Sequence, residues 1–201
     1  MKNIVFIDGE NFKKKIEEVL ITEGKVKKED TSFIKWNKYD FKGLFEKVLQ
    51  GIKINEVNFY FGKITEHKET LEKSRDLIQK SRLLKKHLEN LGYKMIIAGR
   101  VRGFYQQLKN KNVLLFKEKG VDVKIAVDLI TLVCDQELEV AILGSSDSDL
   151  QPAIREIVKR NTTCIYLGFE NNPNKGISFT STRTILIRNA EVLEFFPEPI
   201  I

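Results

Sequence analysis

Short, almost wholly apolar runs alternate along the chain with longer segments of helical spacing. Residues 3–8 form the first run, which is typical of a central parallel strand covered on both faces. Residues 10–21 follow with apolar side chains spaced for one buried helical stripe. The alternation continues without an internal repeat or a linker. It predicts an α/β fold, namely a single three-layer α/β/α sandwich over residues 1–201 with a mostly parallel, Rossmann-like central sheet.

The same patterns place the other elements. Strands are expected at the most apolar or β-branched runs, 56–64, 93–98, 140–143 and 162–167. Helices are expected at segments of helical spacing, 40–50, 66–90, 121–134 and 149–160, the last with Pro152 in its first turn. Residues 22–37 are polar and Lys-rich, which predicts a loop insertion. Residues 100–119 leave strand extension, hairpin and loop open, and residues 182–196 predict a short helix with an edge strand.

Composition excludes some classes of protein. The hydrophobic fraction of 42% over 201 residues is ample for a packed core. No apolar stretch approaches the roughly 18 residues of a membrane span, and the start of the chain lacks a signal-peptide pattern. We therefore expect a cytoplasmic protein without membrane contact. Cys134 and Cys164 lie in apolar segments and are expected to be buried free thiols, because two Cys and two His without close spacing do not form a zinc motif.

Four aspartates follow apolar runs at turns or helix starts: Asp8, Asp122, Asp147 and Asp149. Parallel strands end at one edge of a sheet, where ligands of α/β proteins bind, so these carboxylates are expected to meet. A carboxylate cluster is what a hard cation such as Mg²⁺ requires, and a bound cation relieves the repulsion between the carboxylates. The pattern favours metal-dependent phosphodiester hydrolysis by an activated water.

Each aspartate also has an ordinary structural interpretation. Asp8 before Gly9 is compatible with a turn, Asp122 with a helix N-cap, and either Asp147 or Asp149 with the cap of the next helix. Asn11 is compatible with a local backbone hydrogen bond. Asp128, six positions after Asp122, lies about 120° around the helix and four residues beyond Lys124, so a surface ion pair is predicted for it.

Three segments resemble the signature blocks of NYN-domain proteins, and the LabA-like subgroup of these PIN-like nucleases is the most similar. They are Phe6-Ile-Asp-Gly-Glu-Asn11, Lys119-Gly-Val-Asp-Val-Lys-Ile-Ala-Val-Asp128 and Ser145-Ser-Asp-Ser-Asp-Leu150. The resemblance implies a PIN-like sandwich and Mg²⁺- or Mn²⁺-dependent cleavage of RNA. It implies catalytic roles for Asp8, Asn11, Asp122 and Asp147, and metal binding by Asp8, Asp122, Asp147 and Asp149. The usual last block has Gly and Phe where this chain has Ser146 and Leu150.

Basic and aromatic side chains provide a candidate substrate track in residues 100–119. The net charge of +6 permits nucleic-acid binding without requiring it. Cations position phosphates and aromatic rings stack on unpaired bases, so we expect RNA contacts from Arg100, Arg102, Tyr105 and Lys119. His67 and His87 are expected to face solvent. The predicted partner is single-stranded or structured RNA, and a homodimer is plausible.

Three other functions are possible for an α/β chain with an aspartate after its first strand. A haloacid-dehalogenase-like phosphatase requires Asp-x-Asp after the first strand, whereas this chain has Asp8-Gly9-Glu10. A dinucleotide-binding protein requires Gly-x-Gly-x-x-Gly at that place, and it is missing. The stronger rival is a non-catalytic or weakly active RNA-binding or regulatory module that retains the metal pocket, because fold alone does not establish function.

Overall fold

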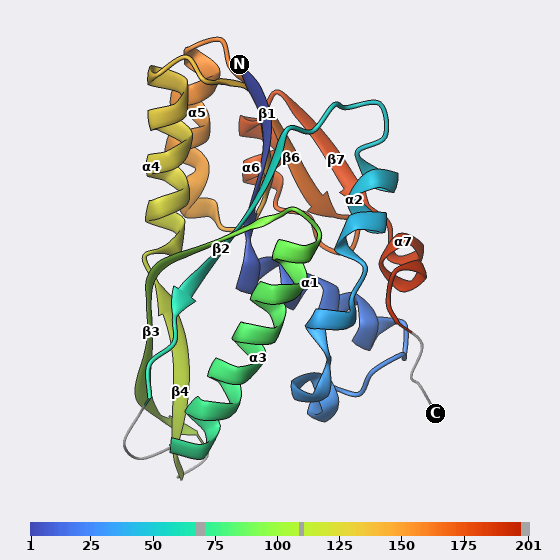
Figure 1. Cartoon of the computed structure of the whole chain (residues 1–201), viewed down its shortest axis with the longest axis vertical. Helices are drawn as coiled ribbons and strands as arrows, with labels where there is room; N and C mark the ends of the chain where they lie inside the picture. Colours follow the sequence, from blue (N-terminus) through green and yellow to red (C-terminus); the bar gives the residue numbers. More distant parts are fainter. Residues whose placement is uncertain (67–70, 109–110, 198–201) are drawn as a thin grey trace.

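A seven-stranded sheet with strand order β4-β3-β2-β1-β5-β6-β7 forms the centre of the molecule (Figure 1). The computed structural model describes residues 1–66, 71–108 and 111–197. The strands are β1 (Lys2–Asp8), β2 (Glu56–Lys63), β3 (Lys94–Leu108), β4 (Lys111–Lys119), β5 (Leu138–Gly144), β6 (Thr163–Phe169) and β7 (Arg183–Ile187). Every neighbouring pair is parallel except β3 and β4. The predicted mostly parallel sheet is therefore confirmed.

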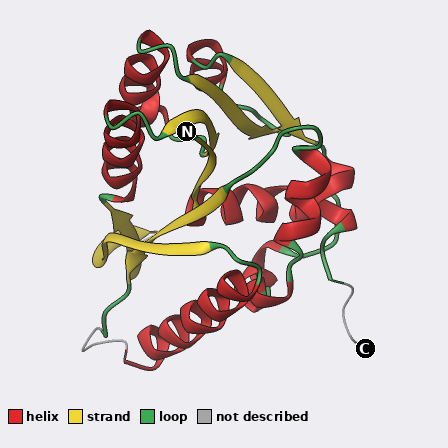
Figure 2. Ribbon diagram, turned by 45° about the horizontal axis from the view of Figure 1, so that its top comes forward, coloured by secondary structure: helices red, strands yellow, loops and turns green. Residues whose placement is uncertain are grey.

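Helices cover both faces of this sheet, as Figure 2 shows. The helices packed against one face are α1 (Gly9–Thr22), α2 (Phe41–Val48), α3 (Leu71–Asn90) and α7 (Asn189–Glu194). Those on the other face are α4 (Val121–Cys134), α5 (Gln151–Lys159) and α6 (Lys175–Thr180). Two separate hydrophobic clusters result, one on each side of the sheet. The three-layer α/β/α sandwich of the PIN-like prediction is confirmed.

The position of β1 at the centre of the sheet explains why its residues are apolar on both faces of the strand. Val5 and Ile7 belong to the cluster under α1, whereas Ile4 and Phe6 belong to the cluster under α4. All four side chains are at most 2% exposed. Since successive residues of a strand point to opposite faces, a central strand covered on both sides cannot carry an alternating polar pattern.

Two segments without a predicted helix or strand have regular structure. Residues 22–37, predicted as a loop insertion, contain the short 3-10 helix η1 (Lys28–Phe33) and the start of a second one, η2 (Trp36–Lys38). Residues 100–119 form an antiparallel hairpin with register from Arg100↔Lys119 to Leu108↔Lys111. Strand β3 therefore runs ten residues beyond the predicted end at Ala98, because β4 supplies a new partner.

The predicted burial of the cysteines and exposure of the histidines are confirmed only in part. Cys164 is buried as expected, but Cys134 is exposed because it lies at the end of α4, outside the buried positions of that helix. His87 does not face solvent: it is half-buried, with Nε2 2.9 Å from the carbonyl oxygen of Tyr39. His67 lies outside the described residues. Among the described helices, none is both long and apolar enough to span a bilayer.

Candidate functional site

The candidate site lies where the order of strands reverses in the sheet. Strand β1 pairs with β2 on one side and with β5 on the other, and the chain leaves these neighbours in opposite directions. Ligands of open α/β sheets bind beyond the carboxyl ends of the strands at such a switch point. Asp8 is the last residue of β1, and the turn Ser145–Asp149 follows β5. Asp8 and the aspartates of this turn therefore lie at the same edge of the sheet.

Three of the four predicted metal ligands converge there. Asp122, Asp147 and Asp149 each offer a carboxylate oxygen, and these oxygens all lie within 4.8 Å of one another. Asp122 and Asp147 are half-buried and Asp149 is exposed, so solvent reaches the group. Oxygen ligands of one Mg²⁺, at about 2.1 Å from the ion, lie about 3 to 4 Å apart in an octahedron. The donor set and its spacing therefore fit a hard divalent cation.

A left-handed glycine brings Asp122 to this edge. Gly120 joins β4 to α4 with φ of 86°, a conformation that side chains other than glycine rarely adopt. Gly120 is also the N-cap residue of α4, so Asp122 is not the cap and lies in the first turn. A carboxylate in the first turn interacts favourably with the positive end of the helix dipole. The helix terminus thus partly offsets the repulsion among the three carboxylates.

The turn after β5 separates the roles of its two aspartates. Asp147 caps the 3-10 helix η4 (Ser148–Leu150), accepting a hydrogen bond of 3.0 Å from the backbone N–H of Asp149. The cap is therefore Asp147, not Asp149. Helix α5 follows directly with Pro152 in its first turn, as predicted. This hydrogen bond fixes the Asp147 carboxylate relative to the backbone of Asp149, whose own side chain is exposed.

Asp8 differs from the other three aspartates. Its side chain is only 7% exposed, and it is not among the carboxylates that converge within 4.8 Å. One oxygen caps α1 by accepting from the N–H of Asn11 at 3.1 Å, and the other lies 3.4 Å from Ser145 Oγ. Burial raises the pKa of Asp8 to about 6, and the charge of Asp147 contributes in the same direction. Asp8 is thus a buried neighbour of the acidic group.

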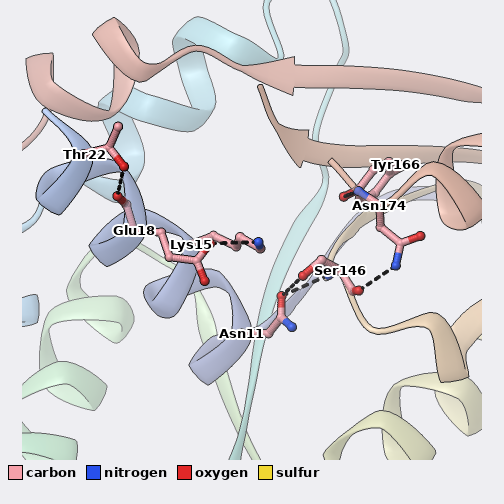
Figure 3. A network of polar contacts seen from close by, with 7 residues as sticks. All are labelled: Asn11, Lys15, Glu18, Thr22, Ser146, Tyr166 and Asn174. Carbon is pink, nitrogen blue, oxygen red and sulfur yellow. Dashed lines mark hydrogen bonds and ion pairs between the residues drawn. The ribbon is translucent and has the colours of Figure 1, made fainter. Parts of the chain in front are cut away.

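Asn11 anchors the turn after β5 rather than its own backbone. Its Oδ1 accepts hydrogen bonds from both the N–H and the Oγ of Ser146, each 2.9 Å long (Figure 3). The non-glycine residues with positive φ in the described chain are Gln136, Asn161 and Asn172. Ser146 therefore occupies the position where the family usually has glycine without backbone strain.

Asp128 takes the structural role that its position predicts. It forms an ion pair with Lys124 four residues earlier and accepts a hydrogen bond of 3.1 Å from the hydroxyl of Tyr60. Two side chains from different elements hold the carboxylate in place. The omission of Asp128 from the candidate metal ligands is consistent with these contacts.

Glu118 is a residue of this region that the sequence did not single out, because a glutamate within a Lys-rich run resembles a solvated charge. It is half-buried at the end of β4 and accepts a hydrogen bond from the N–H of Gly62. Burial raises its pKa to about 7, and the charges of Glu10 and Asp8 add to this shift. A Cβ at Gly62 would lie 2.7 Å from Glu118 Oε1, so any residue larger than glycine there would displace the glutamate side chain.

The structure describes the side chains of two of the four residues predicted to contact RNA. Arg100 and Lys119 face each other across the base of the hairpin, and both side chains are exposed. Lys119 immediately precedes the Gly120 turn, so this pair lies next to the segment that delivers Asp122. The backbone of Arg102 and Tyr105 lies in β3, but their side chains are outside those that the structure describes.

The fold and the place of the acidic group at the strand ends are those of a PIN-like α/β sandwich. The profile of the NYN domain matches residues 2–190, and the chain belongs to this family. The fold is similar to a crystal structure of a protein of unknown function, VPA0982 from Vibrio parahaemolyticus RIMD 2210633. The TM-score is 0.50 at 15% identity, over 92% of this chain and 93% of that one. No curated protein sequence gives a significant match.

Proposed function

We infer that the protein is a divalent-cation-dependent ribonuclease. The observation that carries this proposal is the convergence of Asp122, Asp147 and Asp149 at the switch point of a PIN-like sheet. The family supports nuclease chemistry, and the oxygen-only donor set favours Mg²⁺ or Mn²⁺. In this proposal the three carboxylates hold the cation, and Asp8 supports them from the buried side.

The chain's own residues account for the remaining requirements of phosphodiester hydrolysis. When bound, a divalent cation neutralises charge on the phosphoryl oxygens and lowers the pKa of a water molecule. Asp149 is exposed, and Asp122 and Asp147 are only half-buried, so a cation held by them would be accessible to a substrate phosphate. Asn11 fixes the turn that carries Asp147 and Asp149, which preserves their geometry during turnover.

The base of the hairpin is the proposed contact with RNA. Arg100 and Lys119 present two exposed cations beside the Asp122 segment, suited to phosphates next to the cleaved bond. Arg102 and Tyr105 remain predicted contacts farther along β3, a cation for a phosphate and a ring for stacking on an unpaired base. Single-stranded RNA is the first substrate to test, because its bases are available for stacking.

The test uses wild-type protein with single-stranded RNA and Mg²⁺ or Mn²⁺, with and without EDTA. We expect cleavage that EDTA abolishes and that falls by about 100-fold or more in Asp147→Asn, since a lost cation ligand costs several kcal/mol of transition-state stabilisation. Asp135→Asn is the matched control, because Asp135 is exposed at the far end of α4. RNA that binds but stays intact with each cation would favour a binding module, and cleavage by Asp147→Asn at the wild-type rate would refute the site.

A further inference from the structure

Ser146 is held by all three of its polar groups. Its N–H and its Oγ both donate to Asn11 Oδ1, from the side of α1. Its carbonyl oxygen accepts a hydrogen bond of 2.9 Å from Asn174 Nδ2, from the side of the loop after β6. Figure 3 shows the two asparagines on either side of this residue. The residue that immediately precedes Asp147 therefore has no freedom to rotate without losing hydrogen bonds.

Asn174 is itself fixed from two directions. Its backbone N–H donates to the hydroxyl of Tyr166, on buried strand β6, at 3.1 Å. Its Oδ1 caps α6 by accepting from the N–H of Ile177 at 3.0 Å, and Ile177 is fully buried. With Oδ1 held by the cap, the amide orientation leaves Nδ2 pointing at Ser146. The orientation of the Asn174 amide is thus fixed by its hydrogen bonds to β6 and α6, independently of its contact with the turn.

The turn itself is also internally bonded. Asp147 N–H donates to Ser145 Oγ at 3.2 Å, and Asp149 N–H donates to Asp147 Oδ1 at 3.0 Å. These bonds define the shape of the turn but do not attach it to other elements. Hydrogen bonds to other elements come from Asn11 and Asn174, which both hold Ser146, and from Ser145 Oγ, which donates to Asp8 at 3.4 Å. The position of Asp147 and Asp149 relative to Asp122 therefore depends on both asparagines as well as on Asp8.

We propose that Asn174 is a positioning residue, which works with Asn11 to hold the Ser145–Asp149 turn so that Asp147 and Asp149 meet Asp122. This proposal rests on the proposed function for its catalytic meaning. Side chains that orient cation ligands typically change cation affinity by about 10- to 100-fold when they are removed. The loop between β6 and α6 thereby acquires a role at the acidic group, although it contributes no carboxylate to it.

Two substitutions remove the Nδ2 donor while keeping a cap for α6. Asn174→Asp retains the size and the cap oxygen, and Asn174→Ser retains a capping hydroxyl without adding charge. Agreement between the two variants isolates the lost hydrogen bond from the effect of a new carboxylate. Asn172→Asp is the matched control, because Asn172 is exposed in the same loop and tolerates the same change.

The first readout is hydrogen–deuterium exchange of peptides that span residues 145–150 and 175–180. We expect faster exchange in the first peptide and unchanged exchange in the second for both Asn174 variants. The second readout is Mn²⁺ binding by calorimetry, with Mn²⁺ alone as the probe, where we expect a Kd about 10- to 100-fold weaker. The third is kinetics on RNA, where kcat should fall and KM should remain near the wild-type value.

The outcomes separate this proposal from the proposed function. Wild-type exchange in residues 145–150 together with wild-type Mn²⁺ affinity in both Asn174 variants would overturn the positioning role, whether or not the protein cleaves RNA. Wild-type protein that neither binds Mn²⁺ nor cleaves RNA would refute the nuclease, while faster exchange in the two variants would still establish the attachment of the turn.

Discussion

Strands β1 and β5 lie side by side, and each ends in a turn whose aspartate caps the next helix. Asp8 accepts from the N–H of Asn11 and Asp147 from the N–H of Asp149, at 3.1 and 3.0 Å. The two turns differ in exposure. Asp8 is almost fully buried and its pKa is raised to about 6, whereas Asp147 stands half-buried beside an exposed Asp149. Similar local structure therefore produces one costly buried carboxylate and one solvent-accessible pair.

The difference in exposure gives neighbouring aspartates different roles. Carboxylates that are to hold a cation need a path to solvent and oxygens close to one another, which the turn after β5 and the start of α4 supply. A buried carboxylate costs free energy without a cation, because its charged form is desolvated. Asp8 is thus expected to gain most from a nearby positive charge, although it is not one of the three convergent groups.

The largest expected effect compares the two turns directly. Asp149→Asn removes one of three convergent carboxylates and should weaken Mn²⁺ binding by about 100-fold or more. Asp8→Asn should weaken it by about 10-fold, the size expected for a supporting group. Calorimetric titration of both variants measures this. Equal losses in the two variants would mean that Asp8 is itself a direct ligand, and the distinction between the turns would fail.

The next effect concerns stability in the absence of a cation. The pKa of Asp8 rises from 3.8 to about 6 on folding. A raised acid pKa means that wild-type stability falls as the pH rises between these values and stays lower above about 6. Asp8→Asn lacks this penalty and should be about 2 to 3 kcal/mol more stable at pH 8, with the difference vanishing below about pH 4.

Urea unfolding of the metal-free proteins at pH 8 and pH 4 measures this difference. Asp135→Asn serves again as the control, because Asp135 is exposed. A variant less stable than wild type at both pH values would show that the cap formed by Asp8 outweighs the cost of its burial.

The smallest expected effect is the loss of stability when the Ser146 hydroxyl is removed. Ser146→Gly removes the Oγ–Asn11 hydrogen bond but keeps the N–H bond to the same oxygen. We expect a loss of about 0.5 to 1.5 kcal/mol in the free energy of unfolding beyond that of Ser148→Gly, an exposed serine two residues away. Thermal or urea unfolding of both variants measures it. Identical losses would show that the hydroxyl contributes nothing to the anchoring of the turn.

The sequence predicted the parts that depend on local pattern. Apolar runs located the parallel strands, and Asp8 and the Asp147–Asp149 pair follow two of them at one edge of the sheet. Asp122 reaches the same edge from the start of α4, after the antiparallel strand β4. Residues 100–119 could not be assigned, because an antiparallel partner and a left-handed Gly99 decide the path of β3. Glu118 and Asn174 were missed for a related reason. Their partners, the N–H of Gly62 and the carbonyl of Ser146, are backbone atoms that no residue pattern reveals.

The central place of β1 has a consequence for the order in which the chain can fold. Ile4 pairs with Glu56 on one side and with Ala141 on the other, so β1 keeps an open edge until the residues of β5 have left the ribosome. Closing so long a loop is slow because its entropy must be lost before the new contacts form. Asp147 and Asn174 emerge later still. A nascent chain therefore carries Asp8 long before it can assemble the acidic group, which requires residues as far along the chain as Asp149.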